Sequence, residues 1–279
     1  MRTIKKVASH IFIDGFGGMT QGLFATLIIG TMIQQIGLLI GGSTGNVIYL
    51  LGKAAAALTS AGIGVGVAVK YGESPLVTVS AAVAAMVGGY AGKITGGTFF
   101  VDGNAVLSGP GEPLGAFIAA FAGITCGHLV SGKTKVDIIV TPVITIGAGS
   151  VVGLLVGPPI SQMMTGLGSI INWATEQRPF IMGIVVSVVM GMVLTLPISS
   201  AALGIILNLS GLAAGAATIG CCCNMVGFAV ASYRENKFGG LVAQGLGTSM
   251  LQVPNIMRHP LIWLPVIFSS AILGPVSTI

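Results

Sequence analysis

Apolar stretches long enough to cross a lipid bilayer recur along this chain, and they constrain its fold more than any other feature. A helix needs about 20 predominantly apolar residues to span the hydrocarbon core. Of the 279 residues, 53% are hydrophobic and 7% are charged, whereas soluble domains carry about 25% charged residues. So few charged side chains cannot cover the surface of a water-soluble fold. We therefore expect an all-α polytopic membrane protein that has the lipid bilayer as a partner.

About nine or ten membrane segments are expected, within one permease domain that covers residues 1–279. The expected spans are 17–41, 47–69, 75–92, 114–131, 137–157, 180–196, 198–213, 214–232 and 259–277. Pro142 should interrupt the span 137–157, and Gly157-Pro158-Pro159 should close it before an interfacial helix at 160–178. Residues 93–113 are too polar and broken to span the bilayer. Residues 239–257 are interpreted as a re-entrant hairpin or a tenth helix.

Glycine is unusually frequent, at 44 residues against a usual share of about 7%. Small residues let membrane helices approach closely, and glycine permits the backbone angles of broken helices. Such breaks occur at membrane depth where protein or water surrounds them. The segments 135–144 and 258–267 also resemble each other, and each is followed by small residues and Gly-Pro. Broken helices and an internal repeat are both typical of transporters.

The basic residues indicate orientation, not nucleic-acid binding. The net charge of +5 comes from residues scattered over short loops, without a basic stripe. Cytoplasmic loops of membrane proteins are enriched in Lys and Arg, so a cytoplasmic N-terminus is expected. The other loop residues on that side would be Lys70, Lys133, Lys135, Arg234 and Lys237. No cleavable signal peptide is expected, because 14–18 reads Asp-Gly-Phe-Gly-Gly.

Signatures of catalysis and metal binding are missing from the sequence. It contains no P-loop, no HExxH and no GxSxG pattern. Cys126 and the run 221–223 have no metal-site or ordinary disulfide spacing, so we interpret them as packing residues. We expect no catalytic residues, no metal, no cofactor and no nucleic-acid partner.

Ionisable residues at membrane depth usually line a pathway or cavity, and Glu112 is the first candidate for a substrate-binding residue. It lies in the broken segment 108–113, where its carboxylate could accept hydrogen bonds from sugar hydroxyls or bind a proton or cation. The alternative is a loop glutamate outside the membrane. Asp102, Asn104 and His128 are further candidates. We interpret Lys53 as a side chain that reaches the membrane interface.

Polar residues in the apolar second half form another set of substrate-binding candidates. A proline break before Ser199 and the glycine-rich stretch 244–255 suit the wall of a cavity. Hydrogen bonds between helices are the alternative explanation for each residue. The candidates are Ser199, Asn224, Gln244, Thr248 and Asn255.

The segments 196–256, 259–276 and 16–37 resemble the IIC-like permeases of the sugar phosphotransferase system, some of which are labelled regulators of toxin production. The resemblance implies a bacterial plasma-membrane protein, and a homodimer by analogy. It also implies that a separate IIB subunit phosphorylates the sugar with phosphate relayed from phosphoenolpyruvate. Many members hold the sugar with a glutamate in Gly-Ile-Thr-Glu-Pro. Residues 109–113, Gly-Pro-Gly-Glu-Pro, share its Gly, Glu and Pro but lie earlier in the chain.

The chain departs from that family in ways that affect its expected substrate. It is shorter than typical members, and any IIB or IIA phosphocarrier would be a separate protein. Aromatic residues make up 6% of the chain, so the ring stacking that sugar sites often use is hard to place. We expect a permease that moves a sugar or related small solute by alternating access. The alternatives are an ion-coupled or facilitative carrier of a small organic solute, and a membrane regulator that does not transport.

Overall fold

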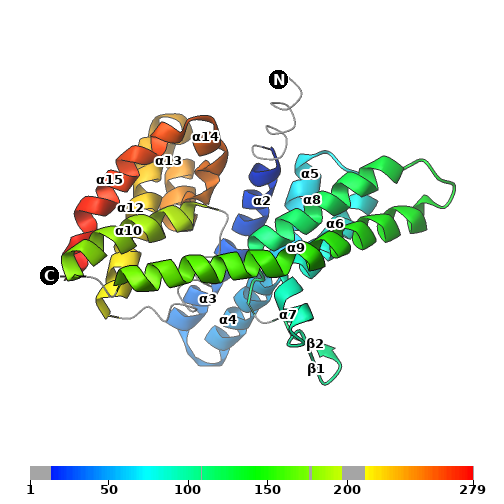
Figure 1. Ribbon diagram of the computed structural model, residues 1–279, viewed down its shortest axis with the longest axis horizontal. Coiled ribbons are helices and arrows are strands. Elements are labelled where there is room, and N and C mark those ends of the chain that lie inside the picture. The colour runs from blue at the N-terminus through cyan, green and yellow to red at the C-terminus, as the bar shows by residue number, and fades with distance from the viewer. Residues whose placement is uncertain (1–13, 108, 176–177, 197–210, 279) are drawn as a thin grey trace. The chain divides into compact units, whose positions relative to one another are not determined.

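The computed structural model describes residues 14–107, 109–175, 178–196 and 211–278 (Figure 1). This part of the chain is almost entirely helical and contains one short two-stranded hairpin. It divides into two compact units, one ending at Ser161 and the other beginning at Gln162. The all-α fold expected from the sequence is confirmed, whereas the expectation that 1–279 acts as a single domain stays a prediction.

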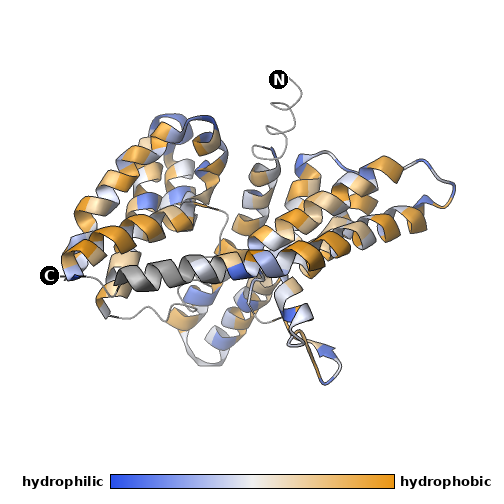
Figure 2. Cartoon of the chain, viewed as in Figure 1, coloured by the Kyte–Doolittle hydropathy of each residue, from blue (hydrophilic) through white to orange (hydrophobic). Residues whose placement is uncertain are grey.

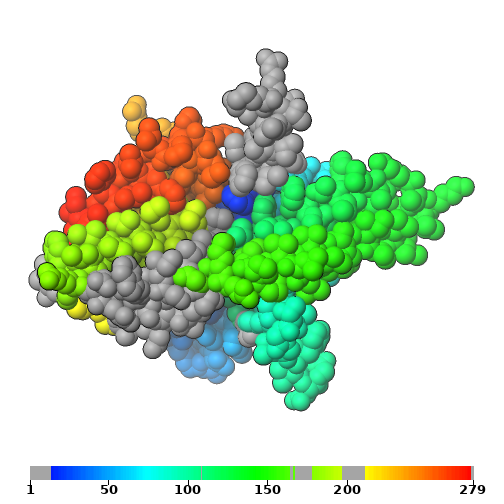
Figure 3. All heavy atoms as spheres, viewed as in Figure 1, coloured from blue at the N-terminus to red at the C-terminus, as the bar shows by residue number. Residues whose placement is uncertain are grey.

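The first unit contains a series of helices joined by short turns, followed by the hairpin and two longer helices. In chain order its elements are α2 (Phe16–Leu23), η2 (Phe24–Ile28), α3 (Ile29–Ile40), α4 (Gly42–Ala57), α5 (Thr59–Lys70), α6 (Pro75–Gly89), α7 (Ala91–Thr95), β1 (Phe100–Val101), β2 (Asn104–Ala105), α8 (Pro113–Val130) and the first part of α9 (Asp137–Thr175). Strands β1 and β2 are antiparallel. Figure 3 shows that α7 and this hairpin project beyond the other helices of the unit.

The second unit is built from three main helices and a chain of short helical pieces. Its elements after α9 are α10 (Pro179–Thr195), α12 (Gly211–Ala231), α13 (Tyr233–Val242), η3 (Ala243–Gly247), η4 (Ser249–Gln252), α14 (Val253–Arg258), η5 (Pro260–Trp263), α15 (Leu264–Leu273) and η6 (Gly274–Thr278). Helices α10, α12 and α15 pack against one another. Met182, Val186 and Met190 of α10 form a buried core cluster with Ala216 and Ala217 of α12.

Five helical segments of the described chain are long and apolar enough to cross a membrane, or six if the bent pair α4–α5 counts as one span. The five are 16–40, 113–130, 137–163, 211–231 and 260–277. Helices α6 and α10 are apolar but shorter, and the expected span 198–213 lies mostly outside the described residues. Figure 2 shows apolar residues along most of these helices and hydrophilic ones concentrated near turns. The polytopic architecture is therefore confirmed with fewer full-length spans than the expected nine or ten segments.

Helix α9 corrects the expected end of the fifth span. It runs without interruption from Asp137 to Thr175 and contains Pro142, Pro158 and Pro159. Each proline removes one backbone donor and disturbs one turn, but the remaining hydrogen bonds of a long helix hold it together. Backbone groups in an apolar environment gain little by leaving the helix. The separate interfacial helix expected at 160–178 is therefore wrong, because 160–175 continues α9.

The stretch 239–257 is not one continuous helix. Its backbone passes from α13 through the π-helical η3 to an extended residue, Thr248, and then through η4 into the six-residue α14. This broken course fits the re-entrant interpretation better than a tenth helix. The expected hydrophilic loop at 234–237 is helical instead, with a kink where Lys237 takes a positive φ of 51°.

Glycines bring helix backbones into contact in both units. A Cβ added to Gly220 of α12 would lie 2.6 Å from the carbonyl carbon of Ser187 in α10, and would also clash with its oxygen. In α9, by contrast, a Cβ added to Gly147 would meet nothing within 4 Å. The close approach of the α10 and α12 backbones therefore requires glycine at position 220. Position 147 has room for a larger residue.

We predict that Gly220→Ala lowers the stability of the protein, because the Ser187 backbone cannot move aside as a flexible side chain could. Overpacking of this kind typically costs about 1–3 kcal/mol. Gly147→Ala is the matched control and should leave the melting temperature unchanged or slightly higher, since alanine favours helix. Thermal unfolding of the purified variants in detergent measures both. Equal melting temperatures for the two variants would contradict the prediction.

Candidate functional site

Three interruptions of helical backbone meet in the first unit. Helices α4 and α5 are bent by 53° at Leu58, which has non-helical φ and ψ of −86° and 10°. Helices α6 and α7 are separated by Tyr90, with φ and ψ of −107° and 10°. The third interruption is the loop 109–112 that leads into α8. Irregular backbone of this kind is tolerated at membrane depth only where protein or water covers it.

Side-chain and backbone hydrogen bonds join these three interruptions. The Tyr90 hydroxyl donates its one proton to the carbonyl oxygen of Gly109 and lies 3.4 Å from the carbonyl oxygen of Ala57. Ser60 Oγ donates to the carbonyl oxygen of Pro110 at 3.0 Å. The backbone N–H of Glu112 donates to the carbonyl oxygen of Gly89 at 2.7 Å. We call this set of contacts the Tyr90 junction.

Gly111 shows why the loop in this junction needs glycine. Its φ is +75°, in the left-handed region that residues with a side chain rarely adopt. A Cβ at this position would also lie 3.1 Å from the carbonyl oxygen of Gly89 and collide with the Ser60 hydroxyl. Backbone conformation and packing therefore both require glycine at position 111, in the loop that leads into α8.

Glu112 has a buried carboxylate oxygen, Oε1, with no hydrogen-bond partner among the described residues. Such an oxygen is costly unless it receives a hydrogen bond or a proton. Burial raises the pKa of this carboxyl to about 7, and the backbone N–H of Leu114 opposes the shift. Glu112 is thus suited to accept a hydrogen bond from a ligand hydroxyl or to bind a proton near neutral pH.

Aromatic residues cluster beside this junction, although their proximity could not be inferred from their positions in the sequence. The Tyr90 ring lies 5.3 Å from that of Phe99, which lies 5.0 Å from that of Phe100. The Lys93 ammonium lies 5.4 Å from the centroid of the Tyr90 ring. Tyr90 itself is buried, whereas Phe100 is 60% exposed. The exposed ring is therefore the one with a face available to another molecule.

Asp102 and Asn104 lie on the exposed β1–β2 hairpin and not among the contacts of the Tyr90 junction. Asp102 takes a positive φ of 50° in the turn, and Asn104 Nδ2 donates to the Asp102 carbonyl oxygen at 3.3 Å. Asp and Asn tolerate such turn conformations better than most residues. The geometry gives both residues a role in the turn, and their substrate role stays a prediction.

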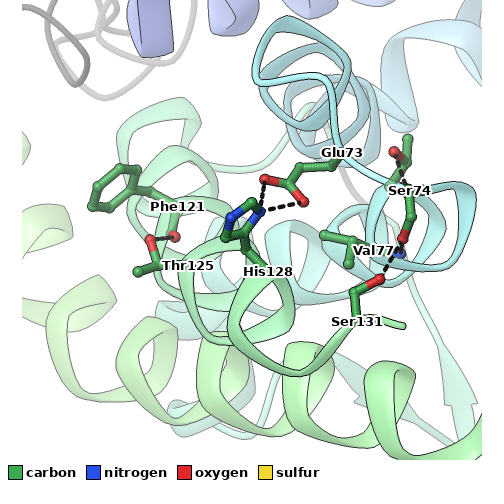
Figure 4. A network of polar contacts seen from close by, with 8 residues as sticks. Glu73, Ser74, Val77, Phe121, Thr125, His128 and Ser131 are labelled. Atoms are coloured by element: carbon green, nitrogen blue, oxygen red, sulfur yellow. Dashed lines mark hydrogen bonds and ion pairs between the residues drawn. The ribbon is translucent and has the colours of Figure 1, made fainter. Parts of the chain in front are cut away.

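His128 pairs with Glu73 at one end of the first unit (Figure 4). Its Nδ1 lies 3.0 and 3.2 Å from the two carboxylate oxygens of Glu73. The Glu73 side chain is 8% exposed and that of His128 is 71% exposed. Nearby, Ser74 Oγ lies 2.9 Å from Ser131 Oγ and accepts from the Val77 N–H as the N-cap of α6. These contacts join the start of α6 to the end of α8.

Asn224 lies at the centre of a buried polar network in the second unit. Its Oδ1 accepts from Thr195 Oγ1 and from Trp263 Nε1, both at 3.3 Å. Its Nδ2 donates to Ser270 Oγ at 3.2 Å. Thr195 Oγ1 also lies 2.8 Å from Ser249 Oγ. This network joins α10, α12, η4, η5 and α15 through neutral groups.

A second chain of amides runs beside η3 and η4. Gln244 Nε2 donates to Ser232 Oγ at 2.9 Å, and Gln244 Oε1 accepts from Gln252 Nε2 at 2.9 Å. Gln252 Oε1 accepts from Asn255 Nδ2 at 2.8 Å. Thr248 accepts from the Met250 N–H at 3.1 Å and caps η4. Gln252 thus links Gln244 to Asn255, and the substrate role of these residues stays a prediction.

The sequence interpretation did not select several residues that these contacts use. Tyr90 was included in an ordinary span, although it follows Gly88-Gly89, a signal for a helix break. Ser60, Trp263 and Ser270 carry no local signal that separates them from ordinary span residues. The predicted residue Ser199 lies outside the described residues. Within the described ranges, no three His, Cys, Asp or Glu side chains are grouped to hold a metal ion.

The apolar helices and the interrupted segments around a buried carboxyl define a multi-pass membrane protein of the permease class. A family model described as the phosphotransferase system EIIC matches residues 13–279, which is almost the whole chain. The chain therefore belongs to the EIIC family, the sugar permeases of phosphotransferase systems, as its sequence resemblance implied. No curated protein and no solved structure matches it.

We predict that Glu112 makes the stability of the protein depend on pH. Its pKa rises from 4.5 to about 7 on folding, so the folded protein binds more protons than the unfolded chain between these values. Stability should therefore fall as pH rises from about 4.5 to 7. Glu112→Gln should flatten this part of the profile, measured as melting temperature against pH. Asp102→Asn is the matched control and should keep the wild-type slope. An unchanged slope in Glu112→Gln would contradict the prediction.

Proposed function

We propose that this protein is the translocating subunit of a phosphotransferase system for a sugar-like, hydroxyl-rich solute. The unpartnered Oε1 of Glu112, held at the Tyr90 junction, is the observation that carries the proposal. A carboxylate oxygen accepts hydrogen bonds from hydroxyl groups, and such charge-assisted bonds are stronger than neutral ones. A separate IIB protein would phosphorylate the solute, in keeping with the family to which the chain belongs.

The interrupted helices support alternating access as the transport mechanism. Hinges are places where a few residues absorb a change in φ and ψ, and the junction brings together Leu58, Tyr90 and the loop 109–112. Asn224, Gln244, Thr248 and Asn255 remain proposed solute contacts in the second unit. Their side chains have hydrogen-bond partners within the protein, and a hydroxyl-rich solute could exchange with these bonds.

A proton-coupled carrier of a small organic solute is the second candidate function. The observation that favours it is the Glu112 carboxyl, whose raised pKa lies near neutral pH. A protonated Glu112 could release its proton when the solute binds or leaves. Uptake that requires phosphoenolpyruvate and a IIB protein supports the first function, whereas uptake that requires only a proton gradient supports the second.

We predict that a hydroxyl-rich solute stabilises the purified protein in detergent and that Glu112→Gln weakens its binding about 10-fold or more, because a hydrogen bond to a charged group is lost. A panel of sugars, sugar acids and polyols, tested by thermal shift, measures this. A ligand at 100 times its Kd should add about 2.7 kcal/mol. Glu235→Gln removes an exposed carboxylate from a residue outside the candidate set and should leave affinity unchanged. Unchanged affinity in Glu112→Gln would overturn the role of Glu112, and a silent panel would favour the regulatory alternative.

We further propose that the protein lies in the bacterial plasma membrane as a homodimer with its N-terminus in the cytoplasm. The turn before α9 and the residues after α12 would then face inwards. Cysteines placed at Lys135 and Asn236, after the native cysteines are replaced, should be labelled by an impermeant thiol reagent only in inside-out vesicles. Labelling of both sites in intact cells would reverse the proposed orientation.

A further inference from the structure

Among the candidate spans of the described chain, Lys53 is the one Lys or Arg apart from Lys70, which ends the same bent pair. It lies about 16 Å along α4 from the first residue, Gly42, at 1.5 Å per residue. Its side chain is exposed and has no hydrogen bond or ion pair with any described residue. A lysine at such a position is costly in lipid and usually marks a solute pathway.

The neighbours of Lys53 make it a poor candidate for simple snorkelling. Exposed apolar side chains lie between Lys53 and the tip of the α3–α4 hairpin, among them Val47, Leu50 and Leu39, the last being 86% exposed. Leu58 is exposed on the other side of Lys53 along the chain. Snorkelling requires the ammonium at the end of the stem to reach water, and the stretch of about 16 Å between Lys53 and the tip is longer than a lysine side chain.

Glycine contacts fix the side of the hairpin from which Lys53 emerges. Helices α3 and α4 are antiparallel (Figure 1), and a Cβ added to Gly52 would lie 2.6 Å from the backbone nitrogen of Gln34. A Cβ added to Gly30 would lie 2.8 Å from the backbone nitrogen of Ala56. The inner faces therefore contain Gly30, Gln34, Gly52 and Ala56.

In an antiparallel pair of right-handed helices, the residues that directly follow such contact positions emerge on the same side of the pair. Lys53 follows Gly52 and Ala57 follows Ala56 on α4, while Thr31 follows Gly30 and Gln35 follows Gln34 on α3. Thr31 and Gln35 are exposed, like Lys53. Around Lys53 this side of the hairpin is therefore polar, and the same side includes Ala57.

Ala57 connects this polar side to the Tyr90 junction. Lys53 and Ala57 are four residues apart on α4 and lie one above the other. The Ala57 carbonyl oxygen lies 3.4 Å from the Tyr90 hydroxyl, which donates to Gly109 in the loop that leads to Glu112. An unpaired cation and a buried, unpartnered carboxylate oxygen therefore lie on elements that meet at one junction.

We propose that Lys53, with Gln35 beside it, forms an anion subsite adjoining the Tyr90 junction, and that the solute is a hydroxyl-rich acid. Its carboxylate or phosphate group would bind the Lys53 ammonium, and its hydroxyls would donate to Glu112. The inference rests on the proposed function for the Glu112 part. A fixed ammonium strengthens the binding of an oxyanion and disfavours a cationic solute.

The test compares matched neutral and acidic solutes on the purified full-length protein in detergent. The pairs are glucose with glucuronate, galactose with galacturonate, and sorbitol with gluconate, and glucose 6-phosphate tests the phosphate form of the same chemistry. We expect at least one acidic member to bind about 10-fold or more tightly than its neutral partner, as befits a hydrogen bond to a charged group. Whether glucuronate or glucose 6-phosphate binds more tightly identifies the anionic group.

Lys53→Gln should reduce this acid preference to about 2-fold or less, and Lys53→Arg should keep most of it, which separates loss of charge from misfolding. Lys70→Gln removes an exposed lysine from the end of the same bent pair and should keep the full preference.

Glu112→Gln should weaken both members of a pair alike. Neutral solutes that bind as tightly as acids, with Glu112 still required, would overturn the anion subsite alone. An acid preference that survives in Lys53→Gln would also overturn it, and absence of binding by all seven solutes would overturn the proposed function as well.

Discussion

The hydroxyl of Tyr90 is the interaction on which the first unit most depends. Where a membrane helix is interrupted, carbonyl groups lose their helical donors, and lipid offers no replacement. Tyr90 lies at one such interruption, donates to the carbonyl of Gly109 in the second, and lies 3.4 Å from the carbonyl of Ala57 in the third. A single buried side chain thus makes three otherwise costly breaks compatible with one another. Glu112 occupies its position because the loop from Gly109 is held in this way.

Much of the fold could be predicted from the sequence because its periodic and compositional signals are local. The spans around α8, α10 and the C-terminal segment follow directly from apolar length, and Ser74-Pro75 marks the start of α6 as its capping geometry requires. Helix α9 was misjudged because proline lowers helical propensity without deciding it. Three prolines in a 39-residue helix still leave most of its backbone hydrogen bonds in place.

The candidate site was only partly predictable, since its members come from segments far apart in the chain. Glu112 could be selected because a carboxyl in a Gly-Pro-rich stretch is conspicuous by itself. Tyr90 and Ser60 could not, because only the fold shows which carbonyls they satisfy. Asn224 was selected as a polar residue in an apolar span, but its partners Thr195, Trp263 and Ser270 depend on the packing of three separate elements.

The neutrality of the Asn224 network has a consequence for how the membrane potential acts on this protein. Moving one elementary charge across the bilayer involves about 2.3 kcal/mol per 100 mV. The described spans of the second unit, 211–231 and 260–277, contain no Asp, Glu, Lys or Arg, and the network itself consists of hydroxyl, amide and indole groups. A rearrangement confined to these elements would move almost no charge and would be nearly insensitive to voltage. Any voltage dependence contributed by the described residues would then arise mainly in the first unit, where Lys53 and Glu112 lie.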